Sequence, residues 1–245
     1  MTQTTALVTG ASQGFGRGIA IALAQAGTHV VGVARDAGRL ADLHGQLGDA
    51  LTPVTADAAD PVVAGELIDT YHPRVLVLNA GARPLARPLH HHTWETFSRN
   101  WDVDVRQAFG WIREALLRPL EEGSVVIAFS SGAALRGSPV SGGYAGAKAT
   151  IRFLAGYAAE ESAREGLGIR FFSVLPQLTP ATATGSAGVA AYAARAGVDV
   201  ATFLADRGPA LTPEQVGASV TELALRPDHV PGAYLISAEG LSPVP

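Results

Sequence analysis

The sequence predicts an α/β fold, a single domain built on a doubly wound parallel β-sheet with helices on both faces. Short apolar, strand-like segments alternate with amphipathic, helix-like segments, which is the order that gives a parallel sheet with crossover helices. After Arg74, the run VLVL at 75–78 is continuously apolar, as expected for a strand buried on both faces. The 245 residues contain no internal repeat, linker or low-complexity segment, so residues 1–245 suit one domain.

The composition indicates a large apolar core and no cysteine chemistry. Hydrophobic residues make up 47% of the chain, and the net charge of −4 gives no electrostatic reason to bind nucleic acid or anionic membranes. Because the chain has no cysteine, disulfides, thiolate metal sites and cysteine nucleophiles are excluded. The N-terminal MTQTTALVTG lacks the features of a signal peptide, and no apolar run is long enough to span a membrane. We therefore expect a soluble, cytoplasmic protein.

A glycine-rich turn follows the first predicted strand, Thr5–Thr9. The strand runs into TGASQGFGRGIAIALAQAG, whose later residues repeat at helical spacing. Bare backbone amides and the positive helix end predict a phosphate cradle. The spacing Gly-x-x-x-Gly-x-Gly is not the commoner Gly-x-Gly-x-x-Gly, and a glycine cluster alone can be a simple turn, but its place between strand and helix favours dinucleotide binding. The cofactor-binding residues expected here are Gly10, Ser12, Gln13, Gly14, Phe15 and Gly16.

The end of the second predicted strand, His29–Ala34, bears on the choice between the two nicotinamide cofactors. An acidic side chain there binds ribose hydroxyls, whereas an arginine accommodates a 2′-phosphate. Asp36 is placed to cap the next helix, which would turn its carboxylate toward backbone amides. Arg35 would then face the ribose, with Arg39 one turn later as support, and this arrangement favours NADP(H) over NAD(H). The alternative is that Arg35 is an ordinary surface charge.

Two further strands bring polar residues to the carboxyl edge of the sheet. Leu51–Thr55 is followed by Asp57, and Arg74–Leu78 ends in Asn79-Ala80-Gly81. Cofactors bind beyond this edge in parallel sheets, so we expect these residues near the cofactor.

The segment after the fourth strand is rich in histidine and aromatic residues. His90–His92 are adjacent and cannot converge on one ion from a regular element, so we expect no metal site. Trp94, Phe97 and Trp101 recur at spacings of three and four, a stripe that is more typical of a core than of a ligand site. A long helix is predicted to run from this stripe to about Leu117.

The fifth predicted strand, Ser124–Ser130, leads into the stretch with the most readable chemistry, FSSGAALRGSPVSGGYAGAKAT. Tyr144 and Lys148 lie four residues apart at a helix start, so they would share one face. A nearby ammonium lowers the pKa of a phenol from about 10, which makes it a usable general acid or base. Ser131, at the strand end, would hold a substrate oxygen beside the phenol.

Lys148 is the only lysine in a chain whose other basic residues are arginines. The two types are not interchangeable, because lysine is a compact point charge and arginine a wide planar fork. The alternative is an exposed helical pair, Tyr144 and Lys148, that contributes little. An ionisable cluster beside a glycine-marked turn is more typical of a functional site.

The last third of the chain contains the one long irregular stretch, residues 178–209, which we expect to be a substrate-binding loop or lid. Its composition is rich in alanine, glycine and threonine. The elements expected in this part are a sixth strand at Ile169–Leu175, weak helical patterns at Gly188–Arg195 and Val200–Asp206, a helix opened by Thr212, and a last short strand at Val230–Ser237.

Jointly, these residues resemble the short-chain dehydrogenase/reductase family across essentially the whole chain. The matching pieces, which occur in the family's order and roughly its spacing, are Thr9-Gly10-Ala-Ser-Gln-Gly14-Phe-Gly16, Asp57, Asn79-Ala80-Gly81, Ser131, Tyr144-x-x-x-Lys148 and Pro176. The resemblance implies a Rossmann-type sheet of about seven strands and hydride transfer between NAD(P) and a carbonyl or alcohol, and with the preference argued from Arg35 the expected cofactor is NADP(H). It also implies a small-molecule substrate and a homodimer or homotetramer formed through helices at 102–117 and 143–165.

The resemblance further assigns roles to single residues. Tyr144 would be the acid or base, Ser131 would position the carbonyl, and Lys148 would lower the pKa of Tyr144 and hold the nicotinamide ribose. Asp57 would lie near adenine and Asn79 near the cofactor backbone. The remaining residues implied at the cofactor are Ala58, Ala80, Gly81, Pro176 and Thr179.

Three positions depart from the family's pattern. Asp104 stands where an asparagine usually helps a water molecule relay protons to the lysine, and Asn100, four residues earlier, is not its substitute. We expect Asp104 in the catalytic group, in water-mediated reach of Lys148, with a net effect on the pKa of Tyr144 whose sign stays open. Gln177 replaces the usual glycine after Pro176, and the chain stops at Pro245, leaving little tail to cover a site.

Two other functions stay open on the sequence. One is a 3-oxoacyl-thioester reductase, although no basic docking surface for an acidic carrier protein is legible. The other is a non-catalytic NAD(P)-binding regulator or scaffold, which only Asp104 and Gln177 favour, since a fold does not prove a function.

Overall fold

The computed structural model describes residues 4–205 and 207–244, and within these ranges the chain forms one sheet of eight strands. The strands are β1 (Thr5–Thr9), β2 (His29–Ala34), β3 (Leu51–Thr55), β4 (Val75–Leu78), β5 (Val125–Phe129), β6 (Arg170–Pro176), β7 (Gly232–Ser237) and β8 (Gly240–Val244). Their order is β3-β2-β1-β4-β5-β6-β7-β8, and every pairing is parallel except that of β7 with β8. The predicted fold class is confirmed.

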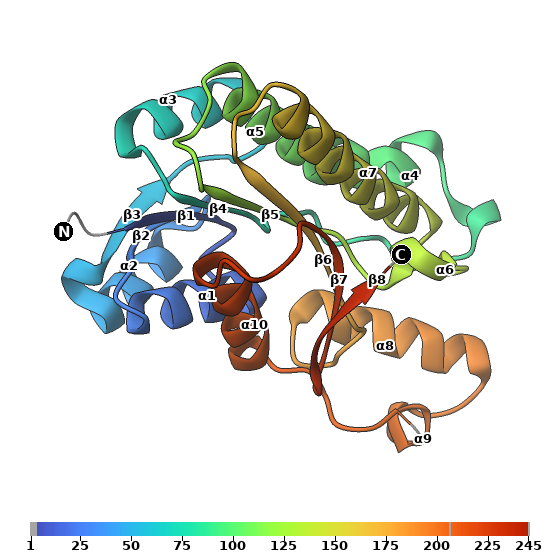
Figure 1. The fold of residues 1–245 in the computed structure, drawn as a ribbon. Coiled ribbons are helices and arrows are strands. Elements are labelled where there is room, and N and C mark those ends of the chain that lie inside the picture. The colour runs from blue at the N-terminus through green and yellow to red at the C-terminus, as the bar shows by residue number, and fades with distance from the viewer. Residues whose placement is uncertain (1–3, 206, 245) are drawn as a thin grey trace.

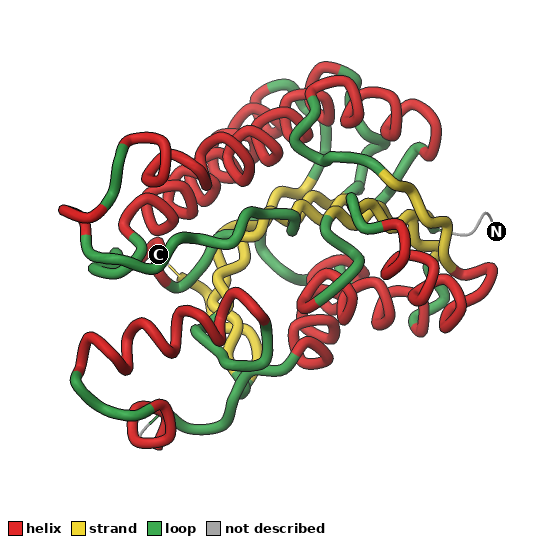
Figure 2. Tube along the Cα trace, turned by 180° about the vertical axis from the view of Figure 1, so that it is seen from behind, coloured by secondary structure: helices red, strands yellow, loops and turns green. Residues whose placement is uncertain are grey.

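Helices connect the strands and cover both faces of the sheet. They are α1 (Gly14–Gln25), α2 (Ala37–Leu47), α3 (Pro61–Tyr71), α4 (Trp94–Asn100), α5 (Arg106–Leu117), α6 (Ala133–Arg136), α7 (Gly142–Arg164), α8 (Ala183–Ala196), α9 (Val200–Ala205) and α10 (Pro213–Leu225). Short 3-10 turns occur at Gly48–Ala50 and Leu89–His91. Figure 1 shows α3, α5 and α7 on one side of the sheet and α1, α2 and α10 on the other, and the same layers appear from behind in Figure 2.

Each face of the sheet buries its own apolar core. On one side, Leu23 of α1 and Val220 of α10 are fully buried in the cluster formed with β1 and β5. On the other side, Trp111 of α5 and Ile68 of α3 pack in a cluster with β4. A strand covered on both faces needs apolar side chains in both directions, which explains the uniformly apolar sequence of β4.

The strand order reverses at β1, which lies between β2 and β4. On the two sides of this point, the connections from one strand to the next run in opposite directions. A crevice therefore opens beyond the carboxyl ends of the strands. The segments that follow β1, β4, β5 and β6 therefore meet at one edge of the sheet.

Three predicted elements differ from the structure. Residues 240–244 form an additional antiparallel edge strand, paired with β7 across a tight turn from Ser237 to Gly240. The helix expected from Trp94 to Leu117 is interrupted by a π-helix at Trp101–Val105. Residues 178–209 are not mainly irregular, because α8 and α9 form where the weak helical patterns lie.

Two residues mentioned in the sequence predictions, Asp206 and Pro245, lie outside the described residues. Within the described ranges, no helix combines the length and apolar character needed to cross a membrane. The same part of the chain gathers no group of three or more histidine, cysteine, aspartate or glutamate residues that could hold a metal ion.

Candidate active site

A cavity of about 1040 Å³ lies beyond the carboxyl ends of the strands. It brings together residues that are far apart in the sequence and that come from both halves of the fold. The predicted residues that line it are Gly10, Ser12, Gln13, Gly14, Phe15, Arg35, Asp57, Ala58, Asn79, Ala80, Gly81, Asp104, Ser131, Tyr144, Lys148, Pro176 and Thr179. Gly16 is the one predicted residue that does not line the cavity.

The turn between β1 and α1 is tight enough to require glycine. Gly10 and Gly14 have φ angles of 70° and 54°, in the left-handed region that other residues rarely adopt. A Cβ atom at Gly16 would overlap the carbonyl oxygen of Gly10. Gly16 therefore acts by allowing α1 to start directly behind the turn, and the start of a helix is a favourable place for an anion.

A buried hydrogen-bond network ties the turn after β4 to the turn after β1. The hydroxyl oxygen of Thr9 accepts from the backbone N–H groups of Asn79 and Ala80 at 3.0 and 3.1 Å, and Asn79 Nδ2 donates to Thr9 O at 3.1 Å. Thr9 in turn donates to Gln107 Oε1 at 2.5 Å, and Gln107 Nε2 donates to Ala80 O at 3.1 Å. Gln107 is 1% exposed, and sequence analysis missed it. The sequence feature that could have identified Gln107 is its position three residues after Asp104.

The end of the cavity next to β2 contains the charged residues that were expected to determine the preference between NADP(H) and NAD(H). Asp36 caps α2 by accepting from the backbone N–H of Arg39 at 3.0 Å, and its carboxylate also pairs with Arg39 Nε at 3.3 Å. The predicted cap is therefore confirmed. Arg39 also donates to the side chain of Gln13. Over the described residues, the one ion pair of Arg35 is with Asp57, at an Nη1–Oδ2 distance of 4.0 Å with both side chains more than half exposed, and Arg35 lines the cavity.

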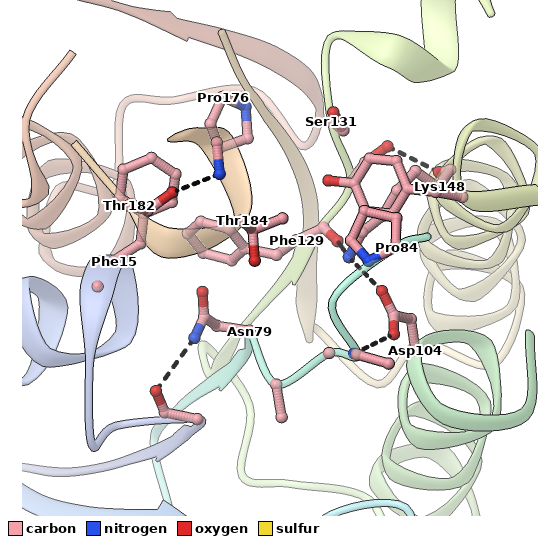
Figure 3. Close-up of a pocket in the computed structure, with 18 of the residues that line it drawn as sticks. Phe15, Asn79, Pro84, Asp104, Phe129, Ser131, Lys148, Pro176, Thr182 and Thr184 are labelled. Atoms are coloured by element: carbon pink, nitrogen blue, oxygen red, sulfur yellow. Dashed lines mark hydrogen bonds and ion pairs between the residues drawn. The ribbon is translucent and has the colours of Figure 1, made fainter. Parts of the chain in front are cut away.

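The other end of the cavity contains the lysine (Figure 3). Lys148 is in the second turn of α7, and its Nζ lies 5.6 Å from the centroid of the Tyr144 ring. Nζ pairs with Asp104 Oδ2 at 3.2 Å and donates to the carbonyl oxygen of Phe129 at 2.9 Å. The ammonium is thus fixed between β5, α7 and the π-helix, beside the phenol ring.

Lys148 is 6% exposed, so the alternative of an exposed helical pair with Tyr144 is wrong. Burial on its own would lower the pKa of the ammonium, but the charge of Asp104, the Tyr144 phenol and the hydrogen bond to Asp104 raise it. The net pKa of Lys148 lies above its ordinary value. The lysine therefore carries a positive charge at neutral pH despite its burial.

Asp104 contacts Lys148 directly, which corrects the expected water-mediated contact. Its side chain is 1% exposed. Oδ1 accepts from the backbone N–H of Ala82 at 2.7 Å and from Asn100 Nδ2 at 3.4 Å, which leaves Oδ2 for the lysine. A Cβ at Gly81 would lie only 2.8 Å from Oδ2, so the glycine makes room for the carboxylate. These contacts hold the carboxylate in one orientation.

The π-helix explains why the contact is direct and not mediated by water. Its extra residue per turn shifts the side chains of Trp101–Val105 relative to a regular helix, and Asp104 is turned into the interior. Asn100, 3% exposed, donates to Ala82 O at 2.8 Å as well as to Asp104. It therefore holds the loop after β4 and the carboxylate together, a supporting role that the sequence did not reveal.

Replacing Asp104 with asparagine should move the alkaline limb of the pH profile of activity to lower pH. The charge of Asp104 and its hydrogen bond raise the pKa of Lys148 against the effect of burial, so the pKa of the lysine falls when the carboxylate is lost. A pH profile of kcat/KM between pH 6 and 10 measures the shift.

Asp102→Asn is the matched control, because Asp102 is in the same π-helix, accepts from Ser98 Oγ at 3.1 Å and does not line the cavity. Its profile should match that of the unchanged protein. An Asp104→Asn profile that also stays in place would show that the carboxylate does not act on the Tyr144–Lys148 pair.

Ser131 and Tyr144 complete the predicted catalytic group, and both line the cavity. Ser131 follows β5, and its Oγ accepts from the backbone N–H of Ala133 at 3.2 Å, which leaves its proton for another acceptor. Gly143, in the first turn of α7, lies against the backbone of Phe97, where a Cβ would overlap the Phe97 carbonyl oxygen. This close approach fixes the helix turn from which Tyr144 projects.

The segment after β6 keeps its place without the usual glycine. The backbone N–H of Gln177 donates to Ile236 O at 2.9 Å, which continues the pairing with β7. The Thr179 hydroxyl is buried and donates to Leu211 O at 2.7 Å. Pro176 and Thr179 both line the cavity, so the substitution at Gln177 does not move this wall away from the site.

A family model described as short chain dehydrogenase matches residues 4–192. An uncharacterized short-chain type dehydrogenase/reductase of Sinorhizobium fredii is 35% identical over 153 residues, which are 60% of this chain and 58% of that protein. Carbonyl reductase [NADPH] 2 of Sus scrofa is 36% identical over 104 residues, 42% of each chain. The chain thus spans less than two thirds of the length of these relatives.

Among solved structures, a candidate NAD(P) dependent gluconate 5-dehydrogenase from Beutenbergia cavernae, with NADP bound at low occupancy, has a TM-score of 0.77 and 29% identity. The similarity covers 91% of this chain and 90% of that one. The family match extends over the glycine turn, the catalytic helix and part of α8, which is well over half of the chain. The protein belongs to the short chain dehydrogenase family.

Proposed function

We propose that the protein is an NADP(H)-dependent oxidoreductase that interconverts a carbonyl compound and a secondary alcohol. The observation that carries the proposal is the buried Asp104–Lys148 pair, with Nζ 5.6 Å from the Tyr144 ring, in the cavity that also contains the glycine turn. A phenol beside a fixed ammonium is suited to exchange a proton at neutral pH. Membership of the family supports the same reaction.

The cavity fits a dinucleotide. Its volume of about 1040 Å³ is at the upper end of the usual range of ligand pockets. The turn at Gly10 presents backbone amides at the start of α1, where a diphosphate is stabilised by the helix end. Asp57 and Arg35 line the cavity and would contact the adenine-ribose part, and Figure 3 shows Asn79 between Phe15 and Asp104. When bound, NADP(H) would supply or accept the hydride.

The chain's own residues would handle the proton and the orientation of the substrate. In reduction, the Tyr144 hydroxyl would donate its proton to the carbonyl oxygen, and in oxidation the phenolate would accept it. Ser131 would donate a hydrogen bond to the same oxygen and hold it beside the phenol. The Lys148 ammonium would stabilise the phenolate, and Asp104 would keep the ammonium in place.

The choice of NADP(H) is supported by Arg35. Among the described residues, its guanidinium forms an ion pair with Asp57 alone, at 4.0 Å, while the Asp36 carboxylate is occupied by the helix cap and Arg39. A planar guanidinium suits a 2′-phosphate. The pig relative is named for NADPH, and the Beutenbergia cavernae structure holds NADP.

Arg35→Ala should erase most of the preference for NADPH over NADH. A charge-assisted pair with the phosphate contributes about 1.5–3 kcal/mol, so the ratio of dissociation constants should fall by roughly tenfold or more. Arg17→Ala is the control, because Arg17 bonds Gln46 on the outside of the cavity. Fluorescence titration with both cofactors gives the constants. Equal constants in the unchanged protein would reject the assignment.

The reaction itself is tested by following NADPH oxidation at 340 nm with a panel of ketones, aldehydes and oxo-thioesters. We expect turnover of at least one carbonyl class and none without a carbonyl. Tight NADPH binding with no turnover of any class would favour a non-catalytic binding protein.

A further inference from the structure

Two arginines approach the cavity from different walls near the catalytic end. Arg136 ends α6, in the segment between Ser131 and Tyr144, and Arg207 follows α9. Figure 1 shows α6 and α9 on opposite sides of the carboxyl edge of the sheet. Both arginines line the cavity and are exposed. Within the described part of the chain, neither is in an ion pair.

Among the described residues, the acidic side chains that line the cavity are those of Asp36, Asp57 and Asp104. The first two follow β2 and β3 at the adenine-ribose end, and Asp104 is paired with Lys148. Over the described residues, Arg136 and Arg207 therefore meet no unpaired carboxylate at this end, and their positive charges attract an anion.

Arg207 is held in place by a column of ring contacts. Its guanidinium lies 4.0 Å from the centroid of the Phe203 ring, and this ring stacks on Tyr192 with centroids 6.2 Å apart and planes 9° apart. Cation–π contact and stacking restrict an otherwise flexible side chain. A guanidinium that is already oriented loses less conformational entropy when it binds a ligand.

The same column is anchored to the catalytic helix. The Tyr192 hydroxyl donates to Ser138 Oγ at 2.6 Å, and Ser138 and Ser141 hydroxyls are 2.7 Å apart. Ser141 directly precedes α7, three residues before Tyr144. These three hydroxyl residues also line the cavity, so the position of Arg207 is linked through them to the wall that carries the phenol.

We propose that the substrate carries an oxyanion group, a carboxylate or a phosphate, which Arg136 and Arg207 bind while the carbonyl lies at Tyr144. This rests on the proposed function for the location of the carbonyl. Guanidinium forks pair with planar carboxylate and with phosphate oxygens. The substrate class is thus an oxo acid or an oxo phosphate ester, rather than a neutral ketone.

Matched pairs of compounds test the proposal. The carboxylate pair is 4-oxopentanoate and its methyl ester, and the phosphate pair is dihydroxyacetone phosphate and dihydroxyacetone. Calorimetric titration of the NADP⁺-loaded protein gives binding, and NADPH oxidation gives kcat/KM. We expect the anion of at least one pair to bind about tenfold tighter than its neutral partner, and the pair that shows this identifies the anion.

The double variant Arg136→Gln/Arg207→Gln should bring that ratio close to one. Arg195→Gln is the matched control, because Arg195 is an exposed arginine of α8 that does not line the cavity, and it should keep the ratio. The proposal would be overturned if, in both pairs, the neutral compound bound as tightly as the anion. It would also be overturned if the ratio of the two affinities were unchanged in the double variant.

The test separates this inference from the proposed function. Reduction of the neutral compounds as efficiently as the anions would leave the proposed reaction standing and remove the anion site. Arginine-dependent binding of an anion without reduction of any carbonyl would support the anion site and reject the reaction.

Discussion

Lys148→Met should abolish most carbonyl reduction and lower the free energy of unfolding by about 3–5 kcal/mol. The methionine fills the space of the lysine but leaves the Asp104 carboxylate, 1% exposed, without its ammonium 3.2 Å away. An unpaired charge in the interior is strongly destabilising. Denaturant unfolding followed by circular dichroism measures the stability, and NADPH oxidation measures the activity.

A second variant separates the structural from the catalytic role of the pair. Lys148→Met/Asp104→Asn removes both charges, so it should recover much of the stability but none of the activity. Lys148→Arg keeps the charge, but the larger fork overfills a site that is 6% exposed, and we expect a loss of about 1–3 kcal/mol and of most turnover. Turnover at the wild-type rate in either variant would show that the lysine is not part of the active site.

Tyr144→Phe should reduce kcat by about 10²- to 10⁴-fold and leave stability and NADPH affinity nearly unchanged. The ring stays beside Lys148 Nζ, 5.6 Å from its centroid, and only the proton donor is lost. Over the described residues the Tyr144 hydroxyl makes no hydrogen bond, so its removal breaks no structural contact.

The control for Tyr144→Phe is Tyr157→Phe on the same helix, where the side chain is 58% exposed and stacks on Phe153. It should keep full activity. A Tyr144→Phe enzyme with more than a tenth of the original kcat would require another proton donor.

The residues at the carboxyl edge of the sheet could be predicted, because their positions follow from local sequence patterns. The strands β1, β4 and β5 were short and largely apolar, and a polar or glycine residue followed each of them. Parallel connections then bring Gly10, Asn79 and Ser131 to one edge. The cap formed by Asp36 was equally local, since a cap depends on residues three positions apart. These features need no knowledge of distant packing.

Features that depend on backbone irregularity or on distant contacts were not predictable. The π-helix at Trp101–Val105 has no signature in the apolar pattern. Asp104 was expected near Lys148, but the direct contact between the two was missed. The role of Gly16 depends on the Gly10 carbonyl behind it. β8 contains Pro243, which is tolerated because the strand lies at the edge of the sheet.

The transfer of deuterium from C4 of NADPH to the product tests the central claim most directly. NADPH dideuterated at C4 is incubated with the protein and a carbonyl compound from the panel, and the alcohol is analysed by mass spectrometry. We predict one deuterium on the carbinol carbon, with formation of labelled alcohol slowed by about 10²- to 10⁴-fold in Tyr144→Phe. An alcohol without deuterium, or labelled alcohol formed equally fast by Tyr144→Phe, would contradict the account.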